Sequence, residues 1–155
     1  MANLNDLAND MDKLLVRLDS FAKQTVKDAA LSIMSDLVQV TPVDVGTALS
    51  NWQLTLDTPA EHVLTAYEPA LRGRNVKGVW THRVDPALTA QANVAPTLDA
   101  AKVVLAERQK GQLVFITNNL PYIRKLNDGS SDQAPAGFVD RAVILGNQVV
   151  QAAKL

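Results

Sequence analysis

The chain has 155 residues, which suits one domain, and 47% of them are hydrophobic, enough for one ordinary core. Lys and Arg total 15 against 16 Asp and Glu, so the strong basic excess typical of nucleic-acid-binding proteins is absent. The chain has no cysteine and no run of roughly 18 apolar residues, which excludes a disulfide framework and predicts no membrane partner.

The first 40 residues carry the strongest pattern. Apolar residues recur at alternating spacings of three and four: Leu4, Leu7, Met11, Leu14, Leu18 and Phe21. The stripe continues, shifted by one residue, through Ala22, Val26, Ala29, Ile33 and Leu37. This pattern predicts one amphipathic helix that ends near Val40, because Pro42 disfavours a helical residue before it. Such a rod is about 50 Å long, so either it kinks or one end projects and meets another subunit.

Two further readings concern this N-terminal segment. Its heptad-like spacing also admits a coiled coil, although the shift after Phe21 breaks the repeat. Residues 1–10 contain no basic residue and no apolar run, so they do not resemble a signal peptide. We therefore expect the protein to be made and used in a cytoplasm.

The next 50 residues begin with a turn-rich loop, 41–47, followed by a strand. Residues 51–57 alternate apolar with polar, which predicts a half-buried strand with Trp52, Leu54 and Leu56 on its buried face. Residues 61–96 show weak periodicity and are expected to be loop with short elements, with 62–66 as a candidate strand. This loop contains a basic cluster with Trp80 interleaved: Arg72, Arg74, Lys77 and Arg83.

The remaining chain predicts two helices around a strand and a short turn of helix. A helix is expected from Thr97, as its cap, to Lys110 and Gly111, followed by a strand at 113–117 that is central or buried on both faces. A short helix at 122–127 and a last helix at 138–153 complete the set. The predicted fold class is α+β: a long N-terminal helix, a small antiparallel β-sheet packed with further helices, and a C-terminal helix. It forms a single domain, 1–155, made of the helix 1–40, a body 41–137 and the C-terminal helix 138–155.

Catalytic chemistry finds little support in the residues. Two histidines and two nearby acids are candidate metal ligands: His62, His82, Glu61 and Asp85. Their spacing matches no known short site, so we expect no metal and no cofactor. Ser130 and Ser131 have no evident histidine base, and short side chains that cap a tight turn explain them better than a hydrolase does. The chain is therefore expected not to be an enzyme.

The basic cluster keeps one alternative open. Basic residues with an aromatic can grip single-stranded nucleic acid, which would suit a small nucleic-acid-binding module. The cluster is short and offers only Trp80 as a stacking platform. We favour a solvated loop, or one that faces an acidic neighbour or passing DNA within an assembly.

Two segments carry a resemblance to a known family. Residues 41–52 read Thr-Pro-Val-Asp-Val-Gly-Thr-Ala-Leu-Ser-Asn-Trp, directly after the long helix. The second segment, residues 114–139, reads Asn-Asn-Leu-Pro-Tyr at 118–122 and Leu-Asn-Asp-Gly-Ser-Ser-Asp-Gln-Ala-Pro-Ala-Gly at 126–137. In this order and separation they resemble the tailed-phage neck and tail-completion family that includes the minor tail protein Z of lambda-like phages. Val45 replaces the usual threonine of the first motif, and Ala48 stands where arginine is frequent.

The residue types in the two motifs suit bends rather than reactions. Pro42 stops the helix, and Gly46 permits a sharp reversal with positive φ. Asn118 and Asn119 favour a turn, and Gly129 can end the short helix. The predicted structural positions are Pro42, Asp44, Gly46, Trp52, Asn118, Asn119, Pro121, Tyr122, Gly129, Pro135 and Gly137.

The resemblance implies a structural subunit of a tailed-phage virion, a tail terminator or tail-completion protein at the head-to-tail junction. Such subunits form rings, commonly hexameric, that cap the tail tube and dock it to the head connector. The implied partners are further copies, the tail tube protein, the head-to-tail connector proteins, and genomic DNA passing without sequence-specific contact. The implied location is the virion neck or tail end, after assembly in the host bacterial cytoplasm. A head-side neck adaptor is the alternative within the same resemblance.

A ring closed by rotation needs two different patches on each subunit. The long first helix and the loop 130–137 are the candidates, because loops often carry contacts and can order on docking. The candidate subunit-interface residues are Asp128, Ser130, Ser131, Asp132 and Gln133.

Overall fold

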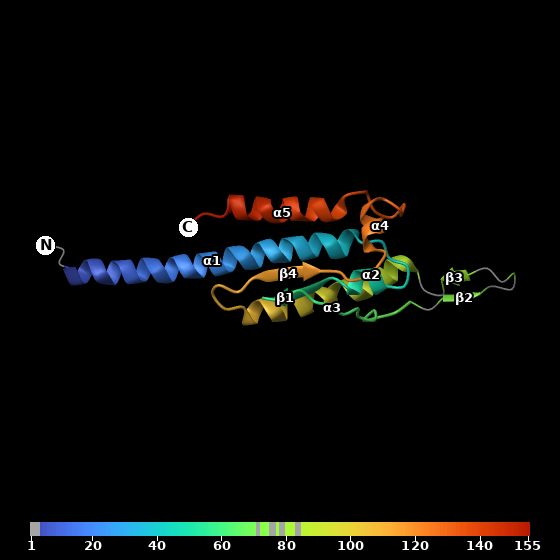
Figure 1. Ribbon diagram of the computed structural model, residues 1–155, viewed down its shortest axis with the longest axis horizontal. Coiled ribbons are helices and arrows are strands. Elements are labelled where there is room, and N and C mark those ends of the chain that lie inside the picture. Colours follow the sequence, from blue (N-terminus) through green and yellow to red (C-terminus); the bar gives the residue numbers. More distant parts are fainter. Residues whose placement is uncertain (1–3, 71, 75–76, 78–79, 83–84) are drawn as a thin grey trace.

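The structure of the protein is a computed structural model that describes residues 4–70, 72–74, 77, 80–82 and 85–155. Its helices and strands, in chain order, are α1 (Leu4–Val40), α2 (Thr47–Ser50), β1 (Gln53–Leu56), β2 (Arg72–Arg74), β3 (Trp80–His82), α3 (Pro86–Glu107), β4 (Val114–Thr117), α4 (Ile123–Asn127) and α5 (Phe138–Ala152). The fold is mixed α+β and mostly helical, which confirms the predicted class (Figure 1).

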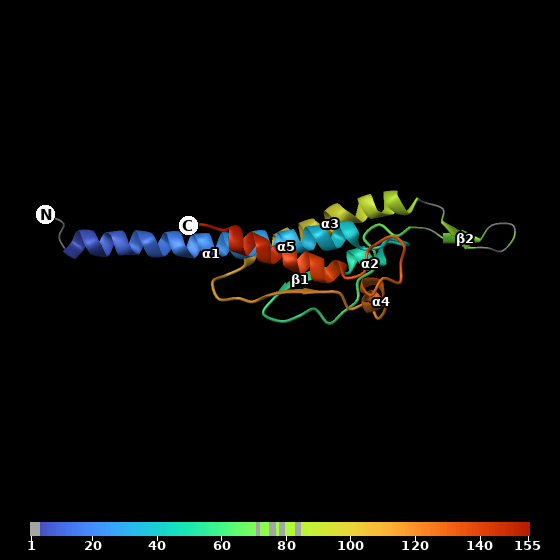
Figure 2. The same ribbon diagram turned by 90° about the horizontal axis from the view of Figure 1, so that it is seen from above.

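The C-terminal half of α1 forms the spine of the body. Ala30, Met34 and Leu37 are buried there, and both α5 and α3 pack against this helix (Figures 1 and 2). At Gly146 of α5, an added Cβ would lie 2.5 Å from the Ile33 side chain. The missing side chain at Gly146 therefore permits the close approach of α5 to α1.

The N-terminal half of α1 leaves the body. Residues 4–20 are exposed, and Figures 1 and 2 show them extending beyond the other elements in line with the rest of the helix. An ion pair between Lys110 Nζ and Asp19 Oδ1, 2.7 Å apart, lies where the body begins. Of the two outcomes predicted for the long rod, the structure has the second, a projecting end.

A two-stranded antiparallel sheet lies against the helices. Residues 53 to 56 of β1 pair with residues 117 to 114 of β4. Trp52 and Leu54 are buried and Leu56 is half-buried, in keeping with the predicted face. The prediction that the second strand is central or buried on both faces was wrong. All four residues of β4 are half-buried, because β1 is its one neighbour among the described strands and leaves much of it uncovered.

Helix α3 begins at Pro86, 11 residues before Thr97. The prediction that this helix starts at Thr97 was therefore wrong. Asp85 caps it, since its Oδ1 accepts from the Ala87 N–H at 2.8 Å, and Pro86 occupies the first turn. Thr97 lies inside the helix, where its hydroxyl donates to the Asn93 carbonyl at 2.8 Å. Polar residues on the buried face, spaced by four, hid the apolar periodicity; the face comprises Thr89, Asn93, Thr97, Ala101 and Leu105.

A short hairpin extends from the end of the body opposite to the start of α1 (Figure 1). Its strands β2 and β3 are antiparallel, with Arg72 opposite His82 and Arg74 opposite Trp80. Residues 61–96 were expected to be loop with short elements, and these two strands are such elements. Residues 62–66, the candidate strand, have no strand structure. Arg83 lies outside the described residues.

Candidate functional site

Residues 60–70 have neither helix nor strand structure, and hydrogen bonds from side-chain amides hold their backbone. Asn51 brackets Leu64: the Leu64 N–H donates to Asn51 Oδ1, and Asn51 Nδ2 donates to the Leu64 carbonyl, both at 2.7 Å. Asn93 brackets Glu68 in the same way, at 2.9 and 2.8 Å. Each amide thus offers the backbone the donor and acceptor that a paired strand would supply. We call this set of contacts the amide clamp.

Several further side chains complete the amide clamp. The Gln53 amide donates to the His62 carbonyl at 2.8 Å, and the Asn119 amide donates to the Ala60 carbonyl at 2.7 Å. Both bracketing asparagines are fully buried. Because a buried amide without partners is costly, this network fixes the path of the chain that leads into the hairpin. Sequence reasoning did not identify Asn93, since it lies in the region of weak periodicity.

The first motif folds as a tight reversal against this network. Gly46 has φ +87°, which confirms the predicted positive value, and a Cβ there would lie 2.8 Å from Asn93 Nδ2. Trp52 is buried, and its indole N–H donates to the Thr41 hydroxyl at 2.8 Å. The Asn118 amide, from the second motif, donates to the Ala48 carbonyl at 2.9 Å. The two motifs therefore meet in space.

The loop after α4 is closed on itself. Gly129 has φ +88° and ends the helix: its N–H donates to the Leu126 carbonyl, and the Ser130 N–H donates to the Lys125 carbonyl, both at 3.1 Å. The C-terminal end of the loop is held by Asn127, because the Asn127 carbonyl accepts a hydrogen bond from the Gly137 N–H at 2.7 Å. These bonds define the conformation of the loop within a single chain.

The candidate interface residues of this loop differ in exposure. Asp128, Ser130 and Asp132 are exposed, and Ser131 is half-buried. Gln133 is exposed as well, but its Oε1 accepts from the Val43 N–H at 3.0 Å and so joins the loop to the first motif. The exposed carboxylates are therefore the polar groups of this set best placed for a partner.

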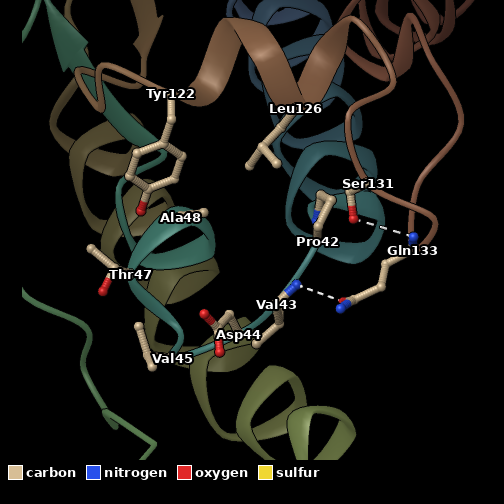
Figure 3. Close-up of a pocket in the computed structure, with 10 residues that line it drawn as sticks. All are labelled: Pro42, Val43, Asp44, Val45, Thr47, Ala48, Tyr122, Leu126, Ser131 and Gln133. Atoms are coloured by element: carbon tan, nitrogen blue, oxygen red, sulfur yellow. Dashed lines mark hydrogen bonds between the residues drawn. The ribbon is translucent and has the colours of Figure 1, made fainter. Parts of the chain in front are cut away.

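A cavity of about 220 Å³ lies between the two motifs (Figure 3). Its lining residues are Pro42, Val43, Asp44, Val45, Thr47, Ala48, Tyr122, Leu126, Ser131 and Gln133. In Figure 3, Tyr122 and Leu126 extend into the space from α4 and the residue before it, across from Asp44. Burial, with a smaller contribution from the Asp44 carboxylate, raises the pKa of Tyr122 above its ordinary value. The ten lining residues supply one carboxylate, three hydroxyls and no histidine base.

Removing the Asp44 charge should therefore lower the pKa of Tyr122. In Asp44→Asn, the phenolate of Tyr122 forms more easily, while burial still keeps its pKa raised above the ordinary value. Titration of the ultraviolet phenolate absorbance measures this shift, and a Tyr122→Phe variant identifies its band against that of Tyr67. An unchanged titration in Asp44→Asn would show that the two groups do not interact.

The described residues of the predicted basic cluster lie in the hairpin, away from His62 in the sequence. Arg72 and Arg74 belong to β2, Lys77 lies in the turn of the hairpin, and His62 lies in the clamped segment. In the described parts of the chain, no three His, Asp or Glu side chains gather as a metal site would require. Across the same residues, no helix has both the length and the apolar character needed to span a membrane.

Comparison with known proteins adds no relative. A scan of family models and searches of the curated proteins and of the solved structures each found no match to this chain.

Proposed function

We propose that the protein is a non-enzymatic structural subunit of a tailed-phage virion, a tail terminator or tail-completion protein at the head-to-tail junction. The observation that carries the proposal is the meeting of the two motifs on which the family resemblance rests. They are joined by the Val43–Gln133 and Ala48–Asn118 hydrogen bonds, at 3.0 and 2.9 Å. The motif residues form turns, close a loop and position the chain. These roles suit a structural subunit whose function depends on its shape.

The arrangement of exposed surfaces is compatible with a ring. The projecting half of α1 and the loop 128–137 lie at opposite ends of α1 (Figure 1). Unlike patches of this kind are what a rotationally closed ring, commonly a hexamer, requires of each subunit. The tail tube protein and the head-to-tail connector are the further proposed partners, with the basic hairpin facing a partner or passing DNA. A head-side neck adaptor would use the same surfaces.

The location of the protein in particles tests the proposal directly. Negative-stain images of virions labelled for this chain should place it at the neck or the tail end. Absence from purified particles would overturn the proposal. If the chain instead retards short DNA in a gel with steep salt dependence, the nucleic-acid-binding alternative holds.

Reversing the loop charges tests the docking surface. The double variant Asp128→Lys with Asp132→Lys should fold normally, because both side chains are exposed. Joining of tails should fall by roughly tenfold or more, a factor that corresponds to about 1.4 kcal/mol of binding free energy. Complementation of a phage that lacks this protein measures the yield of joined particles.

A matched control keeps the same charge change elsewhere. Asp99→Lys with Glu107→Lys alters two exposed positions of α3 and should leave joining intact. Equal loss in both double variants would mean that net charge, and not the loop, is responsible.

A further inference from the structure

The projecting half of α1 exposes a continuous apolar stripe. The exposed fractions are 84% for Leu4, 57% for Leu7, 58% for Met11, 44% for Leu14 and 41% for Leu18. Leu15, beside the stripe, is 58% exposed. Contiguous apolar surface of this kind is uncommon on a protein that stays alone in water, and it usually marks an interaction site.

The apolar stripe of residues 4–21 does not face the body of its own chain. After Phe21 the apolar pattern shifts by one residue, which turns the face of the helix by about 100°. The second stripe faces the body, where Ile33 packs close to α5 and Leu37 is buried. The first stripe points in another direction, and all of its residues except the half-buried Phe21 lie in the stretch 4–20, where the helix is exposed all round.

The first stripe has the period of a coiled-coil seam. Leu4, Met11 and Leu18 are spaced by seven, and Leu7, Leu14 and Phe21 are spaced by seven between them. In an antiparallel pair centred on the stripe, Leu4 faces the partner's Phe21, Leu7 faces the partner's Leu18, and Met11 faces the partner's Leu14. The two-fold axis repeats these three layers, so every seam residue has a partner.

The charges beside the seam select this orientation. In the antiparallel register, Asp10 of each chain lies beside the partner's Arg17, so two ion pairs form on one flank. On the other flank, Leu15 lies beside the partner's Ala8. In a parallel, in-register pair, Asp10 would instead face Leu15 and Arg17 would face Ala22, so neither charge would gain an opposite partner. In the single chain Asp10 pairs with Lys13 at 3.1 Å on the open surface, a contact of little energetic weight.

We propose that two copies of the chain associate through residues 4–21 of α1 as an antiparallel, two-fold symmetric pair. The body begins near the Asp19–Lys110 ion pair, so the two bodies lie at opposite ends of the paired segments. The contact is self-complementary and closes at two copies. It does not rest on the proposed virion function. If a ring used the same stripe, the two-fold pair would have to dissociate before the ring assembled.

Charge reversal combined with mixing tests the pair. Sedimentation equilibrium of the full chain should give the mass of two copies. Asp10→Arg and Arg17→Asp should each weaken association by roughly tenfold, because attractive pairs become repulsive ones on both sides of the axis. Mixing the two variants should restore a dimer that holds one copy of each. Asp12→Arg makes the same charge change off the seam and should have no effect.

Several outcomes of these measurements overturn the proposal. One is a monomeric wild-type chain. Another is a dimer that the single variants leave intact, or that mixing them does not restore. All three positions are exposed, so their thermal unfolding should match that of the wild type. A ring of more than two copies that persists in Asp10→Arg would also overturn the pairing, without contradicting the virion function.

Crosslinking fixes the orientation, since the natural chain has no cysteine. A mixture of Met11→Cys and Leu14→Cys chains should crosslink into mixed dimers, whereas Met11→Cys alone should not. A parallel pair predicts the reverse, with Met11→Cys crosslinking to itself, and that result would overturn the proposed register. Val16→Cys is the control for random collision, because Val16 lies on the side of the helix away from the seam.

Discussion

Replacing Gly46 with alanine should destabilise the protein by about 3 kcal/mol or more. The backbone at Gly46 has φ +87°, a conformation that costs a residue with a Cβ about 1–2 kcal/mol. The new Cβ would also lie 2.8 Å from Asn93 Nδ2 and 3.3 Å from the Ala66 Cβ. Because Asn93 is fully buried and bonded on every side, it cannot yield without breaking the amide clamp. Urea unfolding followed by tryptophan fluorescence measures the loss.

Gly111 supplies the matched control. Its φ is +86°, almost that of Gly46, but an added Cβ there meets no atom within 4 Å. Gly111→Ala should therefore report the backbone strain alone, about 1–2 kcal/mol. The difference between the two variants is the contribution of the close approach to Asn93. If both variants lose the same stability, the contact between the first motif and α3 has no energetic weight.

Elements governed by local rules were predictable from the sequence. The long helix and α5 follow from apolar periodicity, and Pro42 marks the end of the first of them. The glycine turns were also predictable, because Gly46 has the positive φ that its position indicated and Gly129 ends the short helix as expected. In each case the determining interactions lie within a few residues along the chain.

Elements that depend on distant partners were not predictable. Helix α3 was missed over its first 11 residues because its buried face begins with Thr89 and Asn93, whose burial is explained only by the segment they bond. The exposure of β4 was misjudged because the number of neighbouring strands is a tertiary property. Beside the cavity between the motifs, Val43 is hydrogen-bonded to Gln133, which lies 90 residues away in the sequence. No local sequence pattern predicts a contact over such a separation.

The amide clamp is the other feature with a large expected effect, and Asn93→Ala isolates it. The Asn93 side chain accepts from the Ser50 hydroxyl and the Glu68 N–H, and donates to the Glu68 and Thr89 carbonyls, at 2.8 to 2.9 Å. Its removal leaves buried polar groups without partners, and we expect a loss of about 3 kcal/mol in unfolding free energy. Chemical denaturation measures that loss.

Gln91→Ala is the control, because Gln91 is exposed on the same helix and its replacement should change stability by less than about 0.5 kcal/mol. Limited trypsin digestion separates local from global effects. If the clamp positions the chain that enters the hairpin, Asn93→Ala should speed cleavage at Arg72 and Arg74 before the body unfolds, since the freed segment samples open states more often. Equal digestion of Asn93→Ala and Gln91→Ala would mean that the path of residues 60–70 is set by the chain's other contacts, and that the buried amides follow this path without determining it.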